Sequence, residues 1–214
     1  MVEPQFAQIE ERYRFVLPAD FREFWRRGFC TILGPGRPGP QYLFLFDMEW
    51  MPLSEIVAFK FQSYHLPGFV PFAITGAGDY WCWQPEFTQG SSTRVLLCLH
   101  DSYDAEIFAP DFISAVYRQI IDGATAVMNK VEEIETSRRE LAAAVSMLKP
   151  FLSPARLQTL IDIIQRPVQT RHPPTTRSID WHYLLPLHEC REIINRDLGA
   201  DYVDSKFRWM RTGA

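Results

Sequence analysis

The spacing of hydrophobic positions divides the chain into a first part with helical and strand-like patterns and a second part that is mainly helical. Residues 4–14 carry apolar side chains on one helix face, and the segment that begins at Pro18 repeats this spacing. Pro18 fits the first turn of a helix, and Gly28 is a typical residue where a helix ends. We therefore predict two successive helices at the start of the chain.

Short apolar runs separated by turn residues follow these helices. The runs with the length of a strand are residues 42–46, 69–74, 79–84, 94–99 and 105–109. The segment 31–41 is rich in glycine and proline and predicts a loop, residues 52–62 predict a short helix, and Asp111 begins a longer helix that Gly123 ends. Short turns between strands favour antiparallel pairing. This order predicts an α+β fold with an antiparallel sheet flanked by helices.

The second part of the chain has a different character. We predict an α+β domain of residues 1–123, followed by an all-helical C-terminal extension of residues 124–214. The helices predicted in the extension are residues 124–149, 153–166, 186–198 and 202–211. The polar, proline-rich segment 167–178 is predicted to be a connector between two of them.

The first helix of the extension has a heptad pattern. Its apolar residues are Val127, Val131, Ile134, Leu141, Val145 and Leu148. Arg138 interrupts the pattern, and three heptads are too few to show what covers this face. Docking on the chain's own domain is the favoured interpretation. The alternative is docking on a partner or on a second copy, as a homodimer through residues 127–148.

Composition and charge narrow the classes of function. With 214 residues, 47% of them hydrophobic, the chain is long enough to bury a sizeable core. Its net charge of -4 argues against a nucleic-acid binder, because such proteins need a basic face to displace counterions from phosphates. Residues 1–122 hold 9 Lys and Arg against 15 Asp and Glu, whereas residues 123–214 hold 13 against 11. The acidic first part suits a basic protein partner or a cation.

The cysteines and the N-terminal residues indicate the cellular location of the protein. Cys30, Cys82, Cys98 and Cys190 form no CxxC pair, so neither a zinc site nor a disulfide framework is indicated, and free thiols are expected. The first residues have neither the basic start nor the apolar run of a signal peptide. No run approaches the roughly 18 apolar residues of a membrane span. We therefore predict a cytoplasmic protein with no membrane partner.

Two glycines in PFAITGAGDYWCWQP, residues 71–85, raise the question of a phosphate-binding loop. Such a loop leads from a strand into a helix, whose first N–H groups bind the phosphate. Here an aromatic, strand-like segment follows Gly78, so a hairpin turn is the better interpretation. In that strand Trp81 and Trp83 face one way, and Cys82 faces the other. One face must be core, and the pattern leaves open whether the tryptophans point inward, which is slightly favoured for Trp81, or outward as an exposed apolar patch.

Three longer stretches stand in a characteristic order. They are LPADFREFWRRGF at 17–29, FVPFAITGAGDYWCW at 69–83 and AEIFAPDFISAVYRQI at 105–120. Together they resemble the SUKH superfamily, whose founding branch is the Smi–Knr-like group of fungal cell-wall regulators. The resemblance covers about residues 4–122. One departure is Gln84-Pro85, where the family often has an acidic residue at the end of the aromatic strand.

The resemblance implies a binding module that is not an enzyme and needs no cofactor. Many bacterial members are immunity proteins that bind and neutralise toxins, often nucleases, and fungal members act as interaction hubs. Neutralisation of a toxin partner is therefore the first hypothesis, and a regulatory hub without a toxin partner is the alternative. The acidic first part of the chain is compatible with a basic toxin domain.

A carboxylate- or metal-dependent hydrolase is a distant third hypothesis. The acidic residues that follow one another in the first part are Asp79, Glu86, Asp101, Asp104 and Glu106. Aspartate is common at turns for local hydrogen bonding, however, and the usual catalytic and nucleotide-binding motifs are absent from the sequence. We assign no catalytic residue and no metal site.

The residues expected to contact a protein partner are those that turns and strand ends would expose. They are Trp50, Asp79, Trp83, Phe87, Asp104 and Glu106. Large aromatic side chains exposed on a strand would form an apolar patch, which is a usual mark of an interaction surface.

Overall fold

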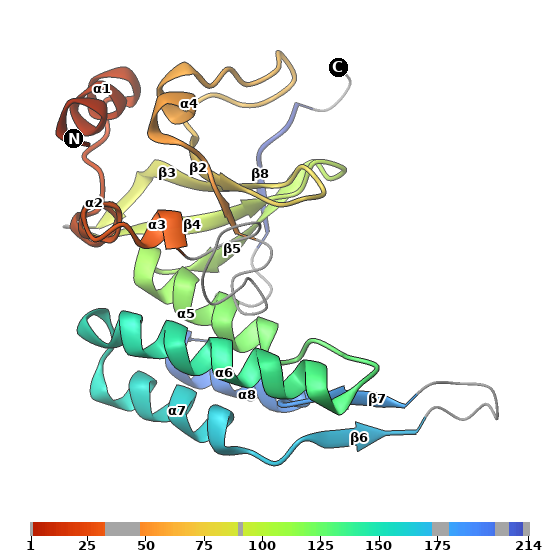
Figure 1. The fold of residues 1–214 in the computed structure, drawn as a ribbon. Coiled ribbons are helices and arrows are strands. Elements are labelled where there is room, and N and C mark those ends of the chain that lie inside the picture. The colour runs from red at the N-terminus through yellow and green to blue at the C-terminus, as the bar shows by residue number, and fades with distance from the viewer. Residues whose placement is uncertain (1, 33–47, 90–91, 173–179, 200–205, 212–214) are drawn as a thin grey trace.

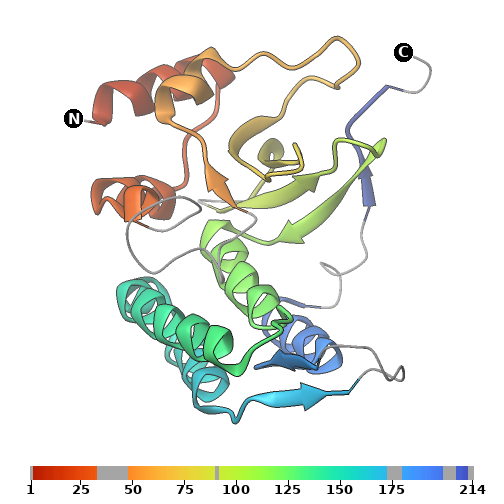
Figure 2. The same cartoon turned by 45° about the vertical axis from the view of Figure 1, so that its right-hand side comes forward.

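The fold has a sheet in one half and helices in the other, with helix α5 (Phe112–Gly123) between them. The computed structural model describes residues 2–32, 48–89, 92–172, 180–199 and 206–211. Figure 1 shows the N-terminal helices above and beside the sheet and the helices of the C-terminal part below α5, and Figure 2 shows the same arrangement after a turn. The predicted class, an α+β fold with an antiparallel sheet and further C-terminal helices, is confirmed.

The two predicted N-terminal helices are present. The helices of this segment are α1 (Glu3–Tyr13), α2 (Ala19–Arg26) and the short α3 (Phe29–Ile32). Pro18 immediately precedes α2, and Gly28 has φ 72° just after its end, a left-handed value that favours glycine. Phe21 and Phe24 of α2 are fully buried against the sheet and α5, which fixes this helix on the core.

The sheet is antiparallel, with six strands in the order β1-β2-β3-β4-β5-β8. Its strands are β1 (Glu49–Trp50), β2 (Val70–Ile74), β3 (Tyr80–Gln89), β4 (Ser92–Cys98), β5 (Asp104–Ala109) and β8 (Lys206–Arg208). Helix α4 (Leu53–Ala58) lies between β1 and β2 in the chain, inside the segment predicted as helical. The predicted strand 42–46 and most of the predicted loop 31–41 lie outside the described residues.

The end of the chain differs from the prediction. Residues 206–208 form strand β8, so the predicted helix over 202–211 and the predicted all-helical extension are wrong. β8 pairs with β5, with Phe207 opposite Ala105. Phe207 and Trp209 alternate with charged residues, and this period of two fits a strand and not a helix.

Both faces of the sheet are buried. Trp81 and Trp83 belong to the main core, which the helices cover, and Cys82 belongs to a second, smaller core on the opposite face. Trp209, which follows β8 and is fully buried, closes the second core. The alternation predicted for the aromatic strand is confirmed, and each of its two sides is core.

The C-terminal part combines helices with a small hairpin. Its helices are α6 (Val131–Leu148), the 3-10 helix η1 (Lys149–Phe151), α7 (Pro154–Gln165) and α8 (Leu187–Leu198). Strands β6 (Gln169–Arg171) and β7 (Trp181–Tyr183) pair with each other between α7 and α8. Part of the predicted connector 167–178 is therefore a strand, and residues 173–179 lie outside the described chain.

The heptad helix docks within the chain. Four of its six apolar heptad residues are buried in the main core: Ile134, Leu141, Val145 and Leu148. Val127 and Val131 are exposed at the start of the pattern. The favoured interpretation, intramolecular docking, therefore agrees with the packing of these four residues.

A polar network ties α5 to α7 and α8. The Tyr117 hydroxyl donates to the Asp197 carboxylate at 2.5 Å, and burial together with this bond raises the pKa of Tyr117 well above its usual range. Arg156 donates to the Ser114 hydroxyl oxygen at 2.9 Å and to the Asp197 carbonyl oxygen at 3.1 Å. The Ser114 N–H donates to the Asp111 carboxylate at 2.7 Å, which caps α5 at the predicted start.

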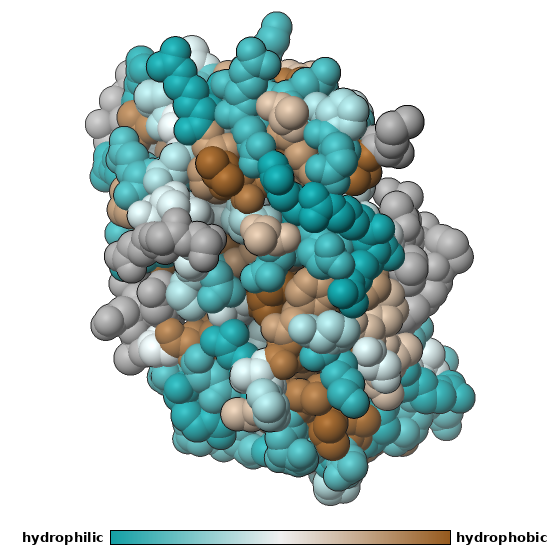
Figure 3. All heavy atoms as spheres, turned by 90° about the vertical axis from the view of Figure 1, so that its left-hand side faces the viewer, coloured by the Kyte–Doolittle hydropathy of each residue, from teal (hydrophilic) through white to brown (hydrophobic). Residues whose placement is uncertain are grey.

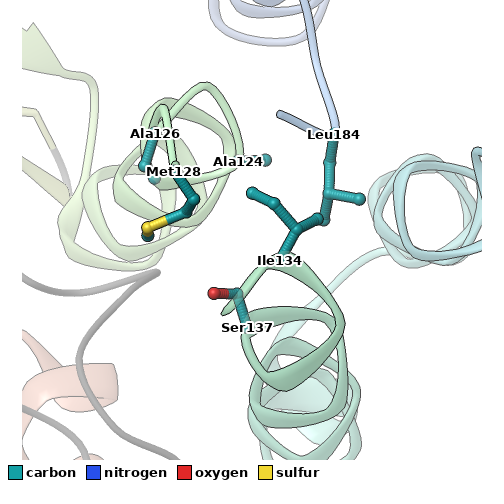
Figure 4. A pocket seen from close by; sticks show the side chains of 7 residues that line it. Ala124, Ala126, Met128, Ile134, Ser137 and Leu184 are labelled. Carbon is teal, nitrogen blue, oxygen red and sulfur yellow. The ribbon is translucent and has the colours of Figure 1, made fainter. Parts of the chain in front are cut away.

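The junction between α5, α6 and the end of β7 is closely packed. Figure 4 shows Ile134 of α6 and Leu184, which follows β7, directed toward the same small cavity. Its volume is about 10 Å³, which is room for one water molecule at most. This cavity is a packing defect and is too small for a ligand.

The outer surface carries both polar and apolar residues. On the face shown in Figure 3, hydrophilic residues interrupt the apolar areas. The exposed large apolar residues of the described chain are Val16, Tyr64, Tyr103, Val127, Val131, Trp181 and Leu187. Tyr64 and Tyr103 line one cleft, and Val127, Trp181 and Leu187 line another. These two groups mark two candidate interaction surfaces.

Candidate functional site

The glycine stretch is a tight hairpin turn between β2 and β3, as predicted. The Gly78 N–H donates to the Thr75 carbonyl oxygen at 3.0 Å, and the Thr75 N–H donates to the Asp79 carbonyl oxygen at 2.8 Å. Gly78 has φ 97°, a left-handed value that favours glycine. The turn leads into a strand and not into a helix, so it lacks the geometry of a phosphate-binding loop.

Asp79 joins this turn to the loop after β4. Its carboxylate accepts hydrogen bonds from the Thr75 hydroxyl at 3.1 Å, the His100 backbone N–H at 2.8 Å and His100 Nδ1 at 2.7 Å. Burial alone would raise the pKa of Asp79, but the hydrogen bonds from His100 and Thr75 outweigh it and lower that pKa. The same hydrogen bond raises the pKa of His100. The pair therefore fixes two loops at one end of the sheet.

A cleft of about 240 Å³ lies beside His100. We call it the sheet-end cleft, and its lining residues are Tyr64, His100, Asp101, Ser102, Tyr103, Met210 and Arg211. The C-terminal segment builds one wall, because the Trp209 N–H donates to the Tyr103 carbonyl oxygen at 3.0 Å and the Arg211 N–H donates to the Tyr64 carbonyl oxygen at 2.8 Å. Two segments more than 100 residues apart in the chain are thereby brought to one site.

The predicted contact residues Asp104 and Glu106 lie on β5, which begins directly after the cleft residue Tyr103. The Asp104 carboxylate is 3.5 Å from the Arg208 guanidinium of β8, and Glu106 pairs in register with Lys206. Both acidic side chains are half-buried. The basic residues of β8 therefore offset part of the negative charge that the sequence places here.

Phe87 is separate from the other predicted residues. It lies seven positions along β3 from Tyr80, is half-buried, and packs edge-on against Phe207 with ring centroids 5.2 Å apart. The Arg94 guanidinium lies 5.4 Å from its ring centroid. Phe87 thus borders the second core and not the sheet-end cleft.

The expected exposure of Trp50 and Trp83 is wrong. Trp83 is 0% exposed and stacks on Phe72 at 4.3 Å between ring centroids, and Trp50 is 7% exposed and packs on Phe24 at 5.5 Å. The sequence pattern left open which face of β3 is covered, and the helices α2 and α5 cover the face that carries these tryptophans. Neither residue can present its ring to a partner in this fold.

Sequence reasoning missed most of the cleft. No sequence motif singled out His100. Its neighbour Cys98 is buried, and burial raises the pKa of the Cys98 thiol, so that it is a poor nucleophile. Tyr103 gave no pattern signal of its own. Arg211 could be placed only by recognising the alternation at Phe207 and Trp209 as a strand that returns to β5.

The described residues can be compared with three kinds of site: metal centres, membrane spans and protein interfaces. Within the described residues, no group of three or more His, Cys, Asp or Glu side chains is arranged to hold a metal ion. No helix of the described chain is long and apolar enough to cross a membrane. The cleft combines an oriented Asp–His pair with exposed tyrosines and an arginine, the residue types that carry binding energy in protein interfaces.

Comparison with known families accounts for the first part of the chain. The model of the SMI1 / KNR4 family (SUKH-1) matches residues 3–116, which is just over half of the chain. No curated protein and no solved structure matches the chain. The matched segment runs from α1 into α5 and includes the hairpin turn, Asp79 and His100. The chain therefore belongs to the SMI1/KNR4 family, SUKH-1.

Proposed function

We propose that the protein binds another protein through the sheet-end cleft and that this partner is a toxin, which binding neutralises. Membership in the SMI1/KNR4 family is consistent with protein binding of the immunity type, and the family is generally non-catalytic. The identity of the partner as a toxin is the more specific part of the proposal. It rests on the resemblance to the SUKH superfamily, many of whose members are immunity proteins. The protein acts by occupying its partner's surface and not by catalysis.

The observation that carries the proposal is the set of exposed aromatic side chains around a fixed Asp–His pair. Tyr64 and Tyr103 are 39% and 51% exposed, and Arg211 lies in the same cleft. Tyrosine and arginine dominate the energetic centres of protein interfaces. Because Asp79 and His100 hold the two loops together, little loop entropy would be lost on binding.

The acidic residues at this end of the sheet favour a basic partner to the extent that Lys206 and Arg208 of β8 do not offset their charge. The lowered pKa keeps Asp79 ionised, but its carboxylate is engaged by His100 and only 15% exposed, so its role is to position the loop. Asp101 lines the cleft and is exposed, and Asp104 and Glu106 lie on β5, which follows the cleft residue Tyr103 in the chain. We propose that these three acidic residues, and not Asp79, contact the partner.

Two further proposals concern the oligomeric state and the cellular location of the protein. A homodimer through residues 127–148 has less support than a monomer, because the chain itself covers most of the apolar heptad residues. Four buried cysteines, all free, are typical of a reducing compartment, which supports the cytoplasmic location.

The test is co-purification of the tagged chain from its native cells, with mass spectrometry at low and high salt. We expect one stoichiometric, basic protein that leaves at high salt, and we expect Tyr103→Ala to lose it. Val16→Ala is the matched control, because Val16 is 79% exposed but lies between α1 and α2. Toxicity of the captured partner, expressed with and without this protein, then tests neutralisation.

Other outcomes separate the alternatives. Several weak partners that all depend on Tyr103 would favour the regulatory hub. A single partner that is not toxic would support protein binding but would refute toxin neutralisation. Absence of any protein partner, or equal capture by Tyr103→Ala and the wild type, would refute this cleft as the binding site.

A further inference from the structure

A second groove lies in the part of the chain that the family match does not cover. Its volume is about 480 Å³, and one face of the β6–β7 hairpin forms its floor. Gln169 pairs with Tyr183 and Arg171 pairs with Trp181, so the side chains of these four residues share that face. Figures 1 and 2 show the hairpin projecting beside the helical half, on the opposite side of α5 from the sheet. We call this feature the hairpin groove.

The groove has a fixed wall on each side. Met128 and His182 exchange two backbone hydrogen bonds of 2.9 and 2.8 Å, which adds the segment before α6 to the edge of β7. Val127 lies next to this bridge. The start of α8, with Leu187 and His188, forms the other wall. The lining residues are therefore held by backbone pairing and by a helix.

Large apolar side chains are exposed in the groove. Val127, Trp181 and Leu187 are 51%, 42% and 60% exposed. Exposed apolar groups gathered in one hollow mark an interaction site more strongly than the same groups scattered over a surface. The volume lies within the range of roughly 300–1,000 Å³ typical of ligand pockets, enough for a few side chains of a bound peptide.

The lining of the groove carries a net positive charge, which comes from Arg171. The lining includes Arg171 and His188 and no carboxylate. The nearest acidic residues in the sequence have partners elsewhere: Asp180 shares a hydrogen bond with His172 Nδ1 at 2.7 Å, and Glu189 forms an ion pair with Arg166. The Arg171 guanidinium lies 6.0 Å from the Trp181 ring centroid and forms no ion pair with a carboxylate of the described residues.

We propose that the hairpin groove binds an extended, acidic peptide segment of a partner protein that also carries large apolar side chains. The apolar side chains would fill the space among Val127, Trp181 and Leu187, and a carboxylate would pair with Arg171. The Arg171 guanidinium already lies over the Trp181 ring, 6.0 Å from its centroid, so the charge stands beside the apolar part of the groove. Charge complementarity thus selects an acidic segment, whereas the proposed partner of the sheet-end cleft is basic.

The experiment is a selection from a random twelve-residue peptide library displayed on phage, with the full-length protein as target. The library is first depleted on the Arg171→Glu variant, which removes peptides that bind elsewhere. We expect the selected peptides to combine Asp or Glu with Leu, Phe or Trp. A selected peptide is then synthesised with a fluorescein label, and its affinity is measured by fluorescence anisotropy.

We expect Arg171→Glu and Leu187→Asp each to weaken this peptide at least about tenfold, and 0.5 M salt to weaken it further. Both side chains are exposed, and aspartate is favourable in the first turn of α8, so folding should be preserved. Val16→Asp is the matched control, since it places the same charge on an exposed apolar site of the N-terminal part, and it should leave affinity unchanged. Tyr103→Ala should also leave it unchanged, which separates this proposal from the toxin proposal.

Several results would overturn the proposal. They are a selection that yields no peptide, selected peptides that are basic, and affinities that Arg171→Glu and Leu187→Asp do not change. A dimer in sedimentation that Leu187→Asp dissociates would assign the groove to a second copy of the chain and would also overturn it.

Discussion

Trp83 is the clearest case of a residue whose role depends on which side of a strand is covered. Its ring stacks on Phe72 and meets the Phe21 ring edge-on at 4.8 Å between centroids. We expect Trp83→Ala to lower the free energy of unfolding by about 3–5 kcal/mol, or roughly 10 °C in melting temperature for a chain of this size. Thermal unfolding followed by circular dichroism measures this change.

The matched control for that substitution is Trp181→Ala. Trp181 is 42% exposed, so its removal should change the free energy of unfolding by less than about 1 kcal/mol. Equal melting temperatures for the two variants would mean that Trp83 is not part of the core.

The Asp79–His100 pair predicts that the stability of the fold depends on pH, with an upper and a lower limit. The raised pKa of His100 means that the folded state holds the proton more tightly than the unfolded state, which stabilises the fold. This stabilisation is complete below the His pKa of 6.5 in the unfolded chain, and it is lost as pH rises through the pKa of the folded state. The lowered Asp79 pKa gives stabilisation that is present above the unfolded value of 3.8 and is lost as pH falls through the folded value. The pair is therefore most effective between these two limits.

An NMR titration of the His100 imidazole measures the upper limit. We expect a pKa above 6.5 in the wild type and a return toward 6.5 in Asp79→Asn, which removes the hydrogen-bonded charge. Asp101→Asn is the control, and it should lower this pKa less because Asp101 acts on His100 through its charge alone. An unchanged titration in Asp79→Asn would contradict the pair.

At the scale of elements, local patterns predicted what local interactions determine. The helix after Pro18, the cap at Asp111 and the turn at Gly78 depend on residues within a few positions, and each forms as predicted. Strand β8 could not be predicted in the same way, because its three residues acquire a partner only when the chain returns to β5. The same holds for the buried face of β3, which is settled by helices from other parts of the chain.

The candidate site was predictable to the extent that it lies in local turns. Asp79 and Asp104 are at turns and strand ends on the same end of the sheet, and the sequence pointed to both. Tyr64, Met210 and Arg211 complete the cleft from segments far apart in the chain, and no spacing rule connects them. The groove on β6 and β7 was hidden for a related reason, since a proline-rich segment indicates a connector and not a paired strand.

At the scale of the whole molecule, the main core is continuous across the predicted domain boundary at residue 123. It joins Trp83 of β3 to Leu141 of α6 and Ile194 of α8, and the hydrogen bonds of Tyr117 and Arg156 cross the same junction. Two independent domains would each close their own core. A shared core instead predicts that the α+β part and the extension unfold together as one cooperative unit.

Leu141→Ala tests this unity, because Leu141 is fully buried in α6 and its loss should cost about 2–5 kcal/mol. If the molecule is one unit, the near-ultraviolet signal of the tryptophans in the sheet should melt at the same reduced temperature as the helical signal, in a single calorimetric transition. Val131→Ala, at an exposed position of the same helix, should leave the melting temperature unchanged in both signals. A lower melting temperature for the helices alone, with the tryptophan signal unchanged, would show that residues 1–123 and 124–214 are independent domains.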